Sequence, residues 1–301
     1  MLTKLILAIM PKLPQSFIWK FSKKYIVGKT LDKALEVSKS MNDDGYIITI
    51  DLLGEFIKDR SEAEQTKEDY LEIVEALHKH NIKGGISVKP TFFGLLIDEE
   101  LCFTNIREVV RKANEYNIFV RIDMEDSSCT DRELEIYEKL HVEFPGIVGI
   151  VLQAYLHRTY DDIERLQKIH TTENPINIRL CKGIYIEDKS IAYQSYEDIN
   201  NNFIKLLDKL FEIRAYVGIA THDKNLVKAA YELLEKHEVS KSLYEFQMLY
   251  GVETRLRKRI HNQGHLMKVY LPFGKDWFGY CVRRLQENPN MVSDIIKSIF
   301  K

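Results

Sequence analysis

The sequence predicts an α/β fold, a (βα)8 TIM-type barrel with an N-terminal helical arm. Short runs rich in β-branched residues alternate with amphipathic stretches of helical spacing, and the strand-like runs recur about every 25 to 35 residues. Several runs are almost continuously hydrophobic, as a parallel sheet covered by helices requires. A doubly wound sheet is the alternative, but no G-x-G-x-x-G follows the first run. Eight strands, each followed by a helix, therefore favour the barrel.

The elements follow one another in a regular order. A polar stretch at residues 30–45 predicts a helix before the first strand. The predicted strands are residues 46–52, 84–89, 118–124, 146–153, 176–182, 215–221, 242–247 and 266–271. Amphipathic stretches between them, for example residues 68–80, 105–116, 131–144 and 196–213, predict helices. No linker or repeat interrupts the pattern, so we expect an arm over residues 1–44 and one barrel domain over residues 45–301.

The N-terminal arm contains an apolar run, Leu5 to Met10, that is too short to span a bilayer. No small-residue cleavage site follows it, which argues against a secretory signal. The arm either packs on the domain or makes a peripheral membrane contact through apolar side chains flanked by lysines. Both interpretations remain open at this stage.

The bulk composition excludes some classes of protein. A formal net charge of −2 gives no support to nucleic-acid binding, which usually requires a basic surface. The four cysteines show no C-x-x-C spacing, which argues against a disulfide framework or a zinc knuckle. A reducing compartment such as the cytoplasm is therefore expected, with membrane association possible.

Polar residues stand at the predicted C-terminal ends of almost all the strands. Chemistry in a barrel of this kind gathers at that rim, so these residues are site candidates. In strand order the candidates are Asp51; Lys89; Arg121, Asp123 and Glu125; Gln153 and Tyr155; Arg179, Lys182 and Tyr185; Thr221, His222 and Asp223; Glu245 and Gln247; and Tyr270. A single residue of this kind would be background, but the whole set is hard to explain as solvation.

Several of these candidates have a structural alternative. Asp123 could form a structural ion pair with Arg121 instead of acting in catalysis. His222 could be a hydrogen-bonded structural residue. A metal could in principle be held by Asp51, Asp123, Glu125 and His222. Lys89, Arg179 and Lys182 bring positive charge to the same rim, however, so an anionic ligand is favoured and no metal site is predicted.

Two adjacent arginines, Arg283 and Arg284, lie in a short aromatic stretch after the last strand. As surface charges, Arg283 would pair with Glu287 in the less favourable order for a helical ion pair. As a clamp, both guanidinium groups would converge on a carboxylate, which suits their planar, bidentate geometry. Tyr280, Arg284 and Glu287 share one helical face, and the helix begins at the catalytic rim, so the clamp is favoured.

The order of these motifs resembles that of the proline dehydrogenase family, flavin-containing barrel enzymes, and most of all its short single-function bacterial form. The matching stretches are VRIDMED, GIVLQAYLHRT, IRLCKGIYIED, GIATHD, YEFQMLYGV and VYLPFGKDWFGYCVRRLQENP. They cover about residues 45 to 290 in consistent order. K-G-x-Y and Y-x-x-R-R-x-x-E are the most diagnostic.

The resemblance implies non-covalent FAD across the barrel mouth and oxidation of L-proline to Δ1-pyrroline-5-carboxylate, with electrons passed to a quinone-type acceptor. It assigns cofactor binding to Gln153, Arg179, Lys182, Gly183, Ile184, Tyr185, Thr221, His222, Asp223 and Gln247. It assigns substrate binding to Lys89, Tyr270, Tyr280, Arg283, Arg284 and Glu287. The catalytic residues it implies are Lys89, Asp123, Arg179, Tyr270 and Tyr280.

The chain departs from the family pattern at four positions. Ile184 replaces a usual alanine beside the flavin, and Pro90 follows Lys89 where a leucine is commoner. Asp223 replaces a usual asparagine near the nucleotide end of the cofactor. Tyr196 occupies a position that is often basic. Asp223 removes amide donors near the nucleotide, and Tyr196 predicts weaker neutralisation of the FAD pyrophosphate.

Three other functions stay open from the sequence. A related barrel flavoprotein could oxidise another cyclic amine, such as hydroxyproline. The barrel could bind an amino acid without turning it over. A metal-dependent hydrolase is a further alternative.

Overall fold

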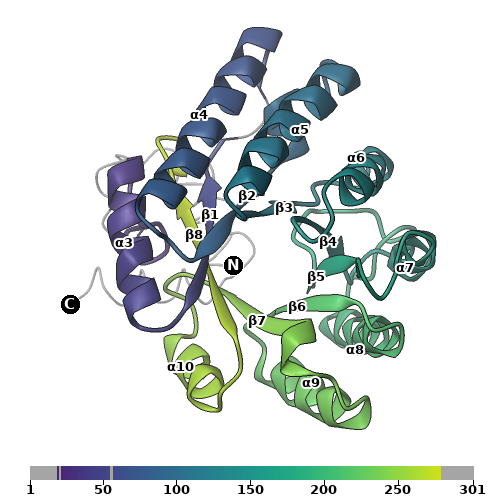
Figure 1. The fold of residues 1–301 in the computed structure, drawn as a ribbon. Helices are drawn as coiled ribbons and strands as arrows, with labels where there is room; N and C mark the ends of the chain where they lie inside the picture. Colours follow the sequence, from purple (N-terminus) through teal and green to yellow (C-terminus); the bar gives the residue numbers. More distant parts are fainter. Residues whose placement is uncertain (1–18, 20–21, 55–56, 279–301) are drawn as a thin grey trace, which may run out of the picture.

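The fold is a closed barrel of eight parallel strands, seen in a computed structural model that describes residues 19, 22–54 and 57–278 (Figure 1). Each strand pairs with its successor in the chain, and β8 pairs with β1. The strands are β1 (Ile47–Leu52), β2 (Gly84–Val88), β3 (Phe119–Ile122), β4 (Val148–Gln153), β5 (Asn177–Cys181), β6 (Tyr216–Ala220), β7 (Tyr244–Leu249) and β8 (Met267–Phe273). The predicted fold class is confirmed, and each strand lies within two residues of its predicted ends.

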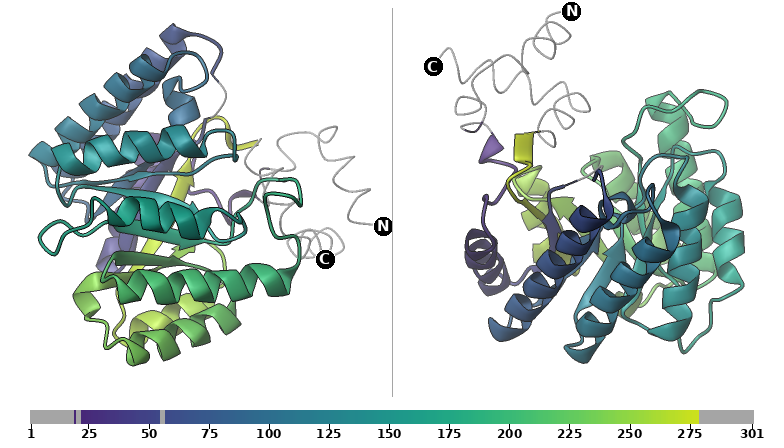
Figure 2. Two further views of the ribbon diagram at one scale, coloured as in Figure 1. Left: turned by 90° about the vertical axis from the view of Figure 1, so that its right-hand side faces the viewer. Right: turned by 90° about the horizontal axis from the view of Figure 1, so that it is seen from above.

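Helices form a ring around the barrel, running along the outside of the strands (Figure 2). They are α3 (Leu31–Asp43), α4 (Arg60–Lys79), α5 (Glu99–Glu115), α6 (Thr130–Glu143), α7 (Thr159–Gln167), α8 (Tyr196–Glu212), α9 (Lys224–Lys236) and α10 (Thr254–Asn262), with short 3₁₀ turns η2 (Pro90–Phe93) and η3 (Lys241–Leu243). The α4 helix begins well before the amphipathic stretch that predicted it. The side chain of Asp59 caps its start by accepting from the backbone N–H groups of Ser61 and Glu62.

The α3 helix belongs to the part of the chain assigned to the N-terminal arm. It packs against β1 and β8 and stands between α4 and α10 in the ring (Figure 1). The first 18 residues of the arm, on which both the packing and the membrane-contact alternatives depend, lie outside the described residues. No helix in the described part of the chain is long and apolar enough to cross a membrane.

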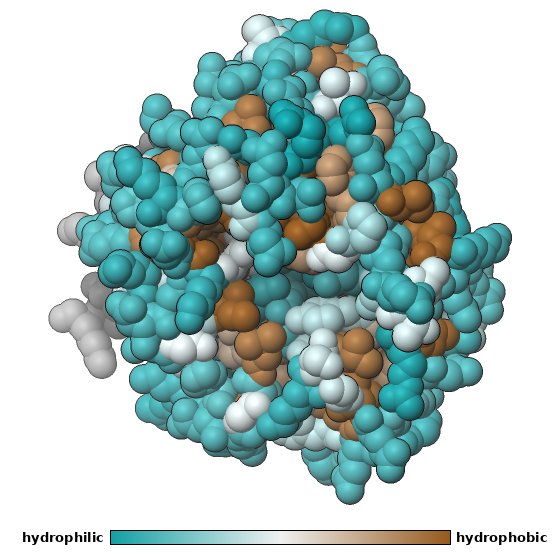
Figure 3. All heavy atoms as spheres, viewed as in Figure 1, coloured by the Kyte–Doolittle hydropathy of each residue, from teal (hydrophilic) through white to brown (hydrophobic). Residues whose placement is uncertain are grey.

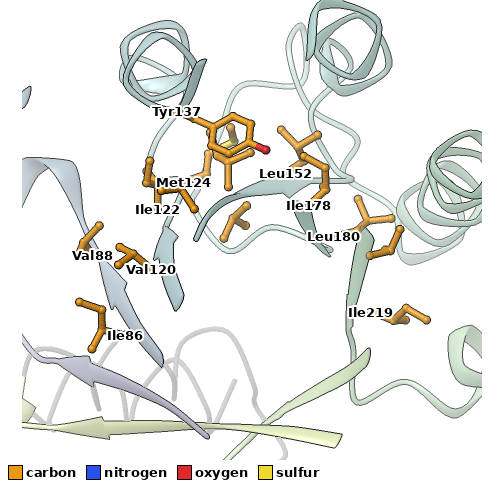
Figure 4. Close-up of a cluster of buried hydrophobic side chains, with 14 of the residues drawn as sticks. Ile86, Val88, Val120, Ile122, Met124, Tyr137, Leu152, Ile178, Leu180 and Ile219 are labelled. Carbon is orange, nitrogen blue, oxygen red and sulfur yellow. The ribbon is translucent and has the colours of Figure 1, made fainter. Parts of the chain in front are cut away.

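The hydrophobic core lies between the barrel and its helices. Strand residues of one parity, such as Ile86, Val120 and Ile178, point outward into it and are fully buried (Figure 4). Burial of such side chains supplies the main driving force for folding, about 25 cal/mol per Å² of apolar surface. The surface on the face seen in Figure 3 is largely hydrophilic, with scattered hydrophobic side chains.

The interior of the barrel is polar, in contrast to its outside. Residues of the other parity point inward and include Asp51, Arg121, Arg179 and Glu245, each at most 7% exposed. Because side chains alternate between the two faces of a strand, this arrangement follows from the register of the barrel. The inward side chains at the C-terminal ends of the strands form the candidate site.

Candidate functional site

Asp123, at the end of β3, is the centre of a hydrogen-bonded network at the C-terminal end of the barrel. Its Oδ1 accepts a hydrogen bond of 2.7 Å from Arg179 Nη1 and one from the Ser87 hydroxyl. Its Oδ2 accepts from the Tyr270 hydroxyl at 2.8 Å and lies 3.8 Å from Lys89 Nζ. Four of these five residues were predicted for the site, and the structure brings them together.

Lys89 connects this network to Asp51 on β1. Its ammonium group donates to Asp51 Oδ1, and Asp51 is only 1% exposed. Burial would lower the pKa of Lys89, but Asp51, together with Tyr270 and Asp123, raises it well above its usual value. Lys89 is therefore a fixed cation over the working pH range, and Pro90 directly after it begins the turn η2.

Arg179 is held at two edges of its guanidinium group. Its Nε donates to Gln247 Oε1 at 2.6 Å, while Nη1 reaches Asp123. Its guanidinium carbon also lies 5.0 Å from the centroid of the Tyr270 ring, within the range of a cation–π contact. These contacts fix the position of the Arg179 guanidinium group at the barrel rim.

The charges of the network are set by burial and by each other. Burial would raise the pKa of Asp123, but Arg179 and Lys89 lower it below its usual value. Burial, and then the carboxylates of Asp123 and Asp51, raise the pKa of Tyr270 well above its usual value. Asp123 is therefore ionised at neutral pH, and the Tyr270 hydroxyl stays protonated and donates a hydrogen bond to Asp123.

The alternative pairing of Asp123 with Arg121 is wrong. Arg121 lies two residues earlier on β3, one layer deeper in the barrel. Its Nη1 donates to the carbonyl oxygens of Ile150 at 2.9 Å and Asn177 at 2.7 Å. Burial, and then the neighbouring Arg179, lower the pKa of Arg121 to about 9, which leaves it charged at neutral pH.

Gln153, at the end of β4, has hydrogen-bond partners for the nitrogen of its amide but none for the oxygen among the described residues. Its Nε2 donates to the carbonyl oxygens of Met124 at 2.9 Å and Glu125 at 3.1 Å. Its Oε1 is buried and has no hydrogen-bond partner among the described residues. A buried acceptor without a partner is costly, so this atom is suited to a ligand that brings an N–H group.

Gly183 follows β5 with a φ of +106°, a conformation that favours glycine. A Cβ atom at this position would lie 2.1 Å from Cδ1 of Tyr155. Its neighbours Ile184, which is 39% exposed, and Tyr185, which is half-buried, lie on the loop that leaves the barrel rim. Glycine is therefore required here both by its φ and by the Tyr155 ring that packs against it, which holds the loop at the barrel rim.

Lys182 and Asp223 form a second polar cluster at the rim. Lys182 Nζ donates to Asp223 Oδ2 at 2.7 Å, and its ammonium group lies 4.4 Å from the centroid of the Tyr196 ring. The same carboxylate oxygen accepts from the Tyr196 hydroxyl and from Asn200 Nδ2, the latter at 3.1 Å. Burial would raise the pKa of Asp223, but these donors lower it. Asp223 therefore neutralises the one predicted cofactor-binding lysine.

Asp223 also caps helix α9. Its Oδ1 accepts from the backbone N–H of Asn225 at 2.9 Å, and its own N–H donates to Thr221 Oγ1 at 3.1 Å. His222 Nε2 accepts from the backbone N–H of Leu249 at 2.9 Å, so Nδ1 carries the proton of the neutral ring. This contact supports the structural interpretation of His222.

The predicted substrate residues after β8 lie outside the described residues. These are Tyr280, Arg283, Arg284 and Glu287. The roles assigned to them, and to the other site residues, stay predictions.

The candidate metal ligands are engaged elsewhere in the described structure. Asp51 and Asp123 face Lys89, and Glu125 accepts from the N–H and hydroxyl of Thr91 at 2.8 and 2.6 Å. Among the described residues, no group of three or more His, Cys, Asp or Glu side chains is arranged to hold a metal ion.

Sequence reasoning left out Ser87 of the Asp123 network and Asn200 of the Lys182–Asp223 cluster. It gave Asp51 only as a strand-end candidate and candidate metal ligand, and Glu245 only as a strand-end candidate. Ser87 had a readable signal, since it is a polar residue on the inward parity of an otherwise apolar strand. Asn200 lies on helix α8, away from any strand end, and its position gave no such signal.

Comparison with known proteins gives a consistent result over most of the chain. Residues 34–297 match the family model described as proline dehydrogenase. Proline dehydrogenase 1 of Bacillus subtilis (strain 168) is 34% identical over 280 residues, covering 93% of this chain and 91% of that protein. Proline dehydrogenase of Deinococcus radiodurans is 32% identical over 294 residues, covering 96% and 93% of the two chains.

A solved structure shares the fold. The crystal structure of proline utilization A from Bdellovibrio bacteriovorus inactivated by N-propargylglycine superposes with a TM-score of 0.84 at 28% identity. The match covers 89% of this chain and 33% of that longer one.

Proposed function

The chain belongs to the proline dehydrogenase family, and we propose that it oxidises L-proline to Δ1-pyrroline-5-carboxylate with non-covalently bound FAD and passes the electrons to a quinone-type acceptor. The observation that carries the proposal is the network of Asp51, Lys89, Asp123, Arg179 and Tyr270 at the C-terminal ends of the strands. In a barrel enzyme this rim is where substrates bind.

The residues present fit a flavin. Gln153 Oε1 is a buried acceptor without a partner in the described structure, and a flavin ring carries an N–H group that could donate to it. The close packing of Gly183 against Tyr155 holds the adjoining loop at the rim. Arg179 and Lys182 bring donors and positive charge to the same rim. When bound, the flavin supplies the redox chemistry by accepting a hydride from C5 of proline.

The protein's own residues bind, orient and exclude water. Arg283 and Arg284 would hold the carboxylate of proline as a bidentate clamp. Tyr270 would cover one side of the substrate, and its hydroxyl stays a donor to Asp123, so it is not the base that takes the proton of the amine. Arg179 would stabilise negative charge that develops as electrons arrive at the cofactor.

The test is the visible spectrum of the purified protein. We expect a yellow protein whose flavin absorption is bleached anaerobically by L-proline. Bleaching by hydroxyproline, measured in parallel, shows whether proline is the preferred amine. Colourless protein that FAD cannot reconstitute would refute the proposal.

The carboxylate clamp has its own test. Arg284→Lys replaces a planar fork by a point charge, so the KM for proline should rise by about tenfold or more while the protein stays yellow. An unchanged KM would show that Arg284 does not touch the substrate. Reduction of a soluble quinone analogue by the proline-reduced enzyme tests the acceptor.

A further inference from the structure

A buried carboxylate, Glu245 on β7, lies one layer below the network and takes no part in the mechanism described above. It is 1% exposed, and its Oε1 lies 2.8 Å from Lys268 Nζ on β8. Burial would raise the pKa of Glu245, but Lys268 lowers it. Glu245 is therefore an ionised group that can only accept hydrogen bonds.

Gln247 connects Glu245 to Arg179. Its Nε2 donates to Glu245 Oε1 at 2.7 Å, and its Oε1 accepts from Arg179 Nε at 2.6 Å. A glutamine amide can turn over and exchange its oxygen and nitrogen. Here only one orientation is possible, because a carboxylate cannot donate and a guanidinium group cannot accept.

The amide of Gln247 is closely packed and shielded from water. Gly218 of β6 lies against it, and a Cβ atom there would be 2.4 Å from Gln247 Nε2. Gln247 is 5% exposed, so water does not compete for its amide. The amide of Gln247 is thus fixed from both sides, by the carboxylate of Glu245 below and the guanidinium group of Arg179 above.

We propose that Glu245 is a positioning residue for Arg179, acting through the amide of Gln247. The proposal rests on the proposed function, in which Arg179 faces the flavin. A neutral side chain at position 245 that can donate as well as accept no longer fixes the amide from below. Gln247 is then held by Arg179 alone, and the guanidinium group loses the support that keeps it in place.

If the Glu245–Lys268 ion pair served stability alone, Glu245 would not affect Arg179. Two variants distinguish this structural role from the positioning role. Glu245→Gln removes the charge that orients Gln247. Glu245→Gln combined with Gln247→Glu keeps the net charge and places a carboxylate next to Arg179, which accepts from Arg179 whichever way it turns. Both variants remove the carboxylate that pairs with Lys268.

The experiment measures the melting temperature of the flavin-free protein, the reduction potential of the bound flavin, and kcat/KM for L-proline. We expect both variants to melt at a lower temperature. Glu245→Gln should lose about tenfold in kcat/KM and shift the potential, while the double variant should recover about threefold of that loss. Asp162→Asn is the matched control, because Asp162 is also buried, at 3% exposed, but pairs with Arg158 in the outer layer.

The outcomes are distinct. If kcat/KM falls equally in the single and the double variant, in step with the melting temperature, the ion pair is structural and the inference is refuted. If Glu245→Gln leaves both kcat/KM and the potential unchanged, it is refuted as well. Failure of the proposed function would show itself separately, as a parent protein whose flavin proline does not bleach.

Discussion

Asp123 offers the sharpest test of the network, because one carboxylate there accepts from donors on three other strands or strand ends. Asp123→Asn preserves the shape but removes the charge, and it turns an NH₂ group toward at least one of the donors Arg179, Ser87 and Tyr270. Breaking a buried ion pair by removing one partner costs about 3–5 kcal/mol. We therefore expect the free energy of unfolding to fall by about that amount.

This loss translates into a measurable shift in melting temperature. With an unfolding entropy of about 2.1 cal/mol/K per residue, a chain of this length should melt about 5–8 °C lower. Calorimetry on the parent, on Asp123→Asn and on Asp162→Asn checks this. The outer-layer control should cost about 1 kcal/mol or less, because the Arg158 side chain is 36% exposed and keeps Asp131 as a partner. A double-mutant cycle with Tyr270→Phe should give a coupling of about 1.5–3 kcal/mol.

The same variant should lose at least about tenfold in kcat/KM for L-proline, since Arg179 and Lys89 are no longer held in place. A melting temperature within about 2 °C of the parent, or additive effects in the cycle, would refute the reasoning. Either result would mean that water or a rearranged side chain replaces Asp123 at little cost.

Three further outcomes follow from the site. Gly183→Ala should abolish the yellow colour of the purified protein, because its Cβ would overlap the Tyr155 ring and displace the loop at the rim. Gly146→Ala, at a positive φ with nothing within 4 Å, should cost only backbone strain, so equal FAD content in the two variants would show that the Gly183 loop does not contribute to FAD binding. Asp223→Asn removes the carboxylate that pairs with Lys182 and should tighten FAD binding by about three- to tenfold in a fluorescence titration. Weaker binding would show that the Asp223 cap of helix α9 contributes more to FAD binding than the charge of Lys182 does. The pKa of Asp123 is lowered in the folded state, so its contribution to stability is complete above the unfolded pKa of about 3.9 and is lost as the pH falls through the folded pKa. The difference in melting temperature between the parent and Asp123→Asn should therefore hold from about pH 5.5 to 8 and shrink below about pH 4. A difference that does not change with pH would contradict this.

The sequence was most informative about the strands and least informative about which side chains pair with one another in the site. The β-branched runs predicted all eight strands because each is buried on its outer face. The beginning of α4 was missed because its first turns are polar and carry no apolar period. Its start depends on the Asp59 cap instead.

Partners within the site depend on depth in the barrel, which strand ends do not encode. Arg121 and Asp123 share one strand and one face, but the two-residue spacing puts them in different layers, about 7 Å apart along the strand. Arg121 therefore meets backbone carbonyls, while Arg179, from β5, reaches Asp123. The stagger of neighbouring strands determines this pairing, and the stagger is visible only in the closed barrel.

The polar interior has a consequence for how the barrel can be divided. Asp51, Lys89 and Asp123 come from its first half, whereas Arg179 and Tyr270 come from the second. Lys89 can still pair with Asp51 in the first half, and Lys268 with Glu245 in the second, but the bonds of Asp123 to Arg179 and Tyr270 cross the division. Either half expressed alone would therefore leave Asp123 or Arg179 without its partner, and these two groups should favour association of the two fragments with each other over association of like halves.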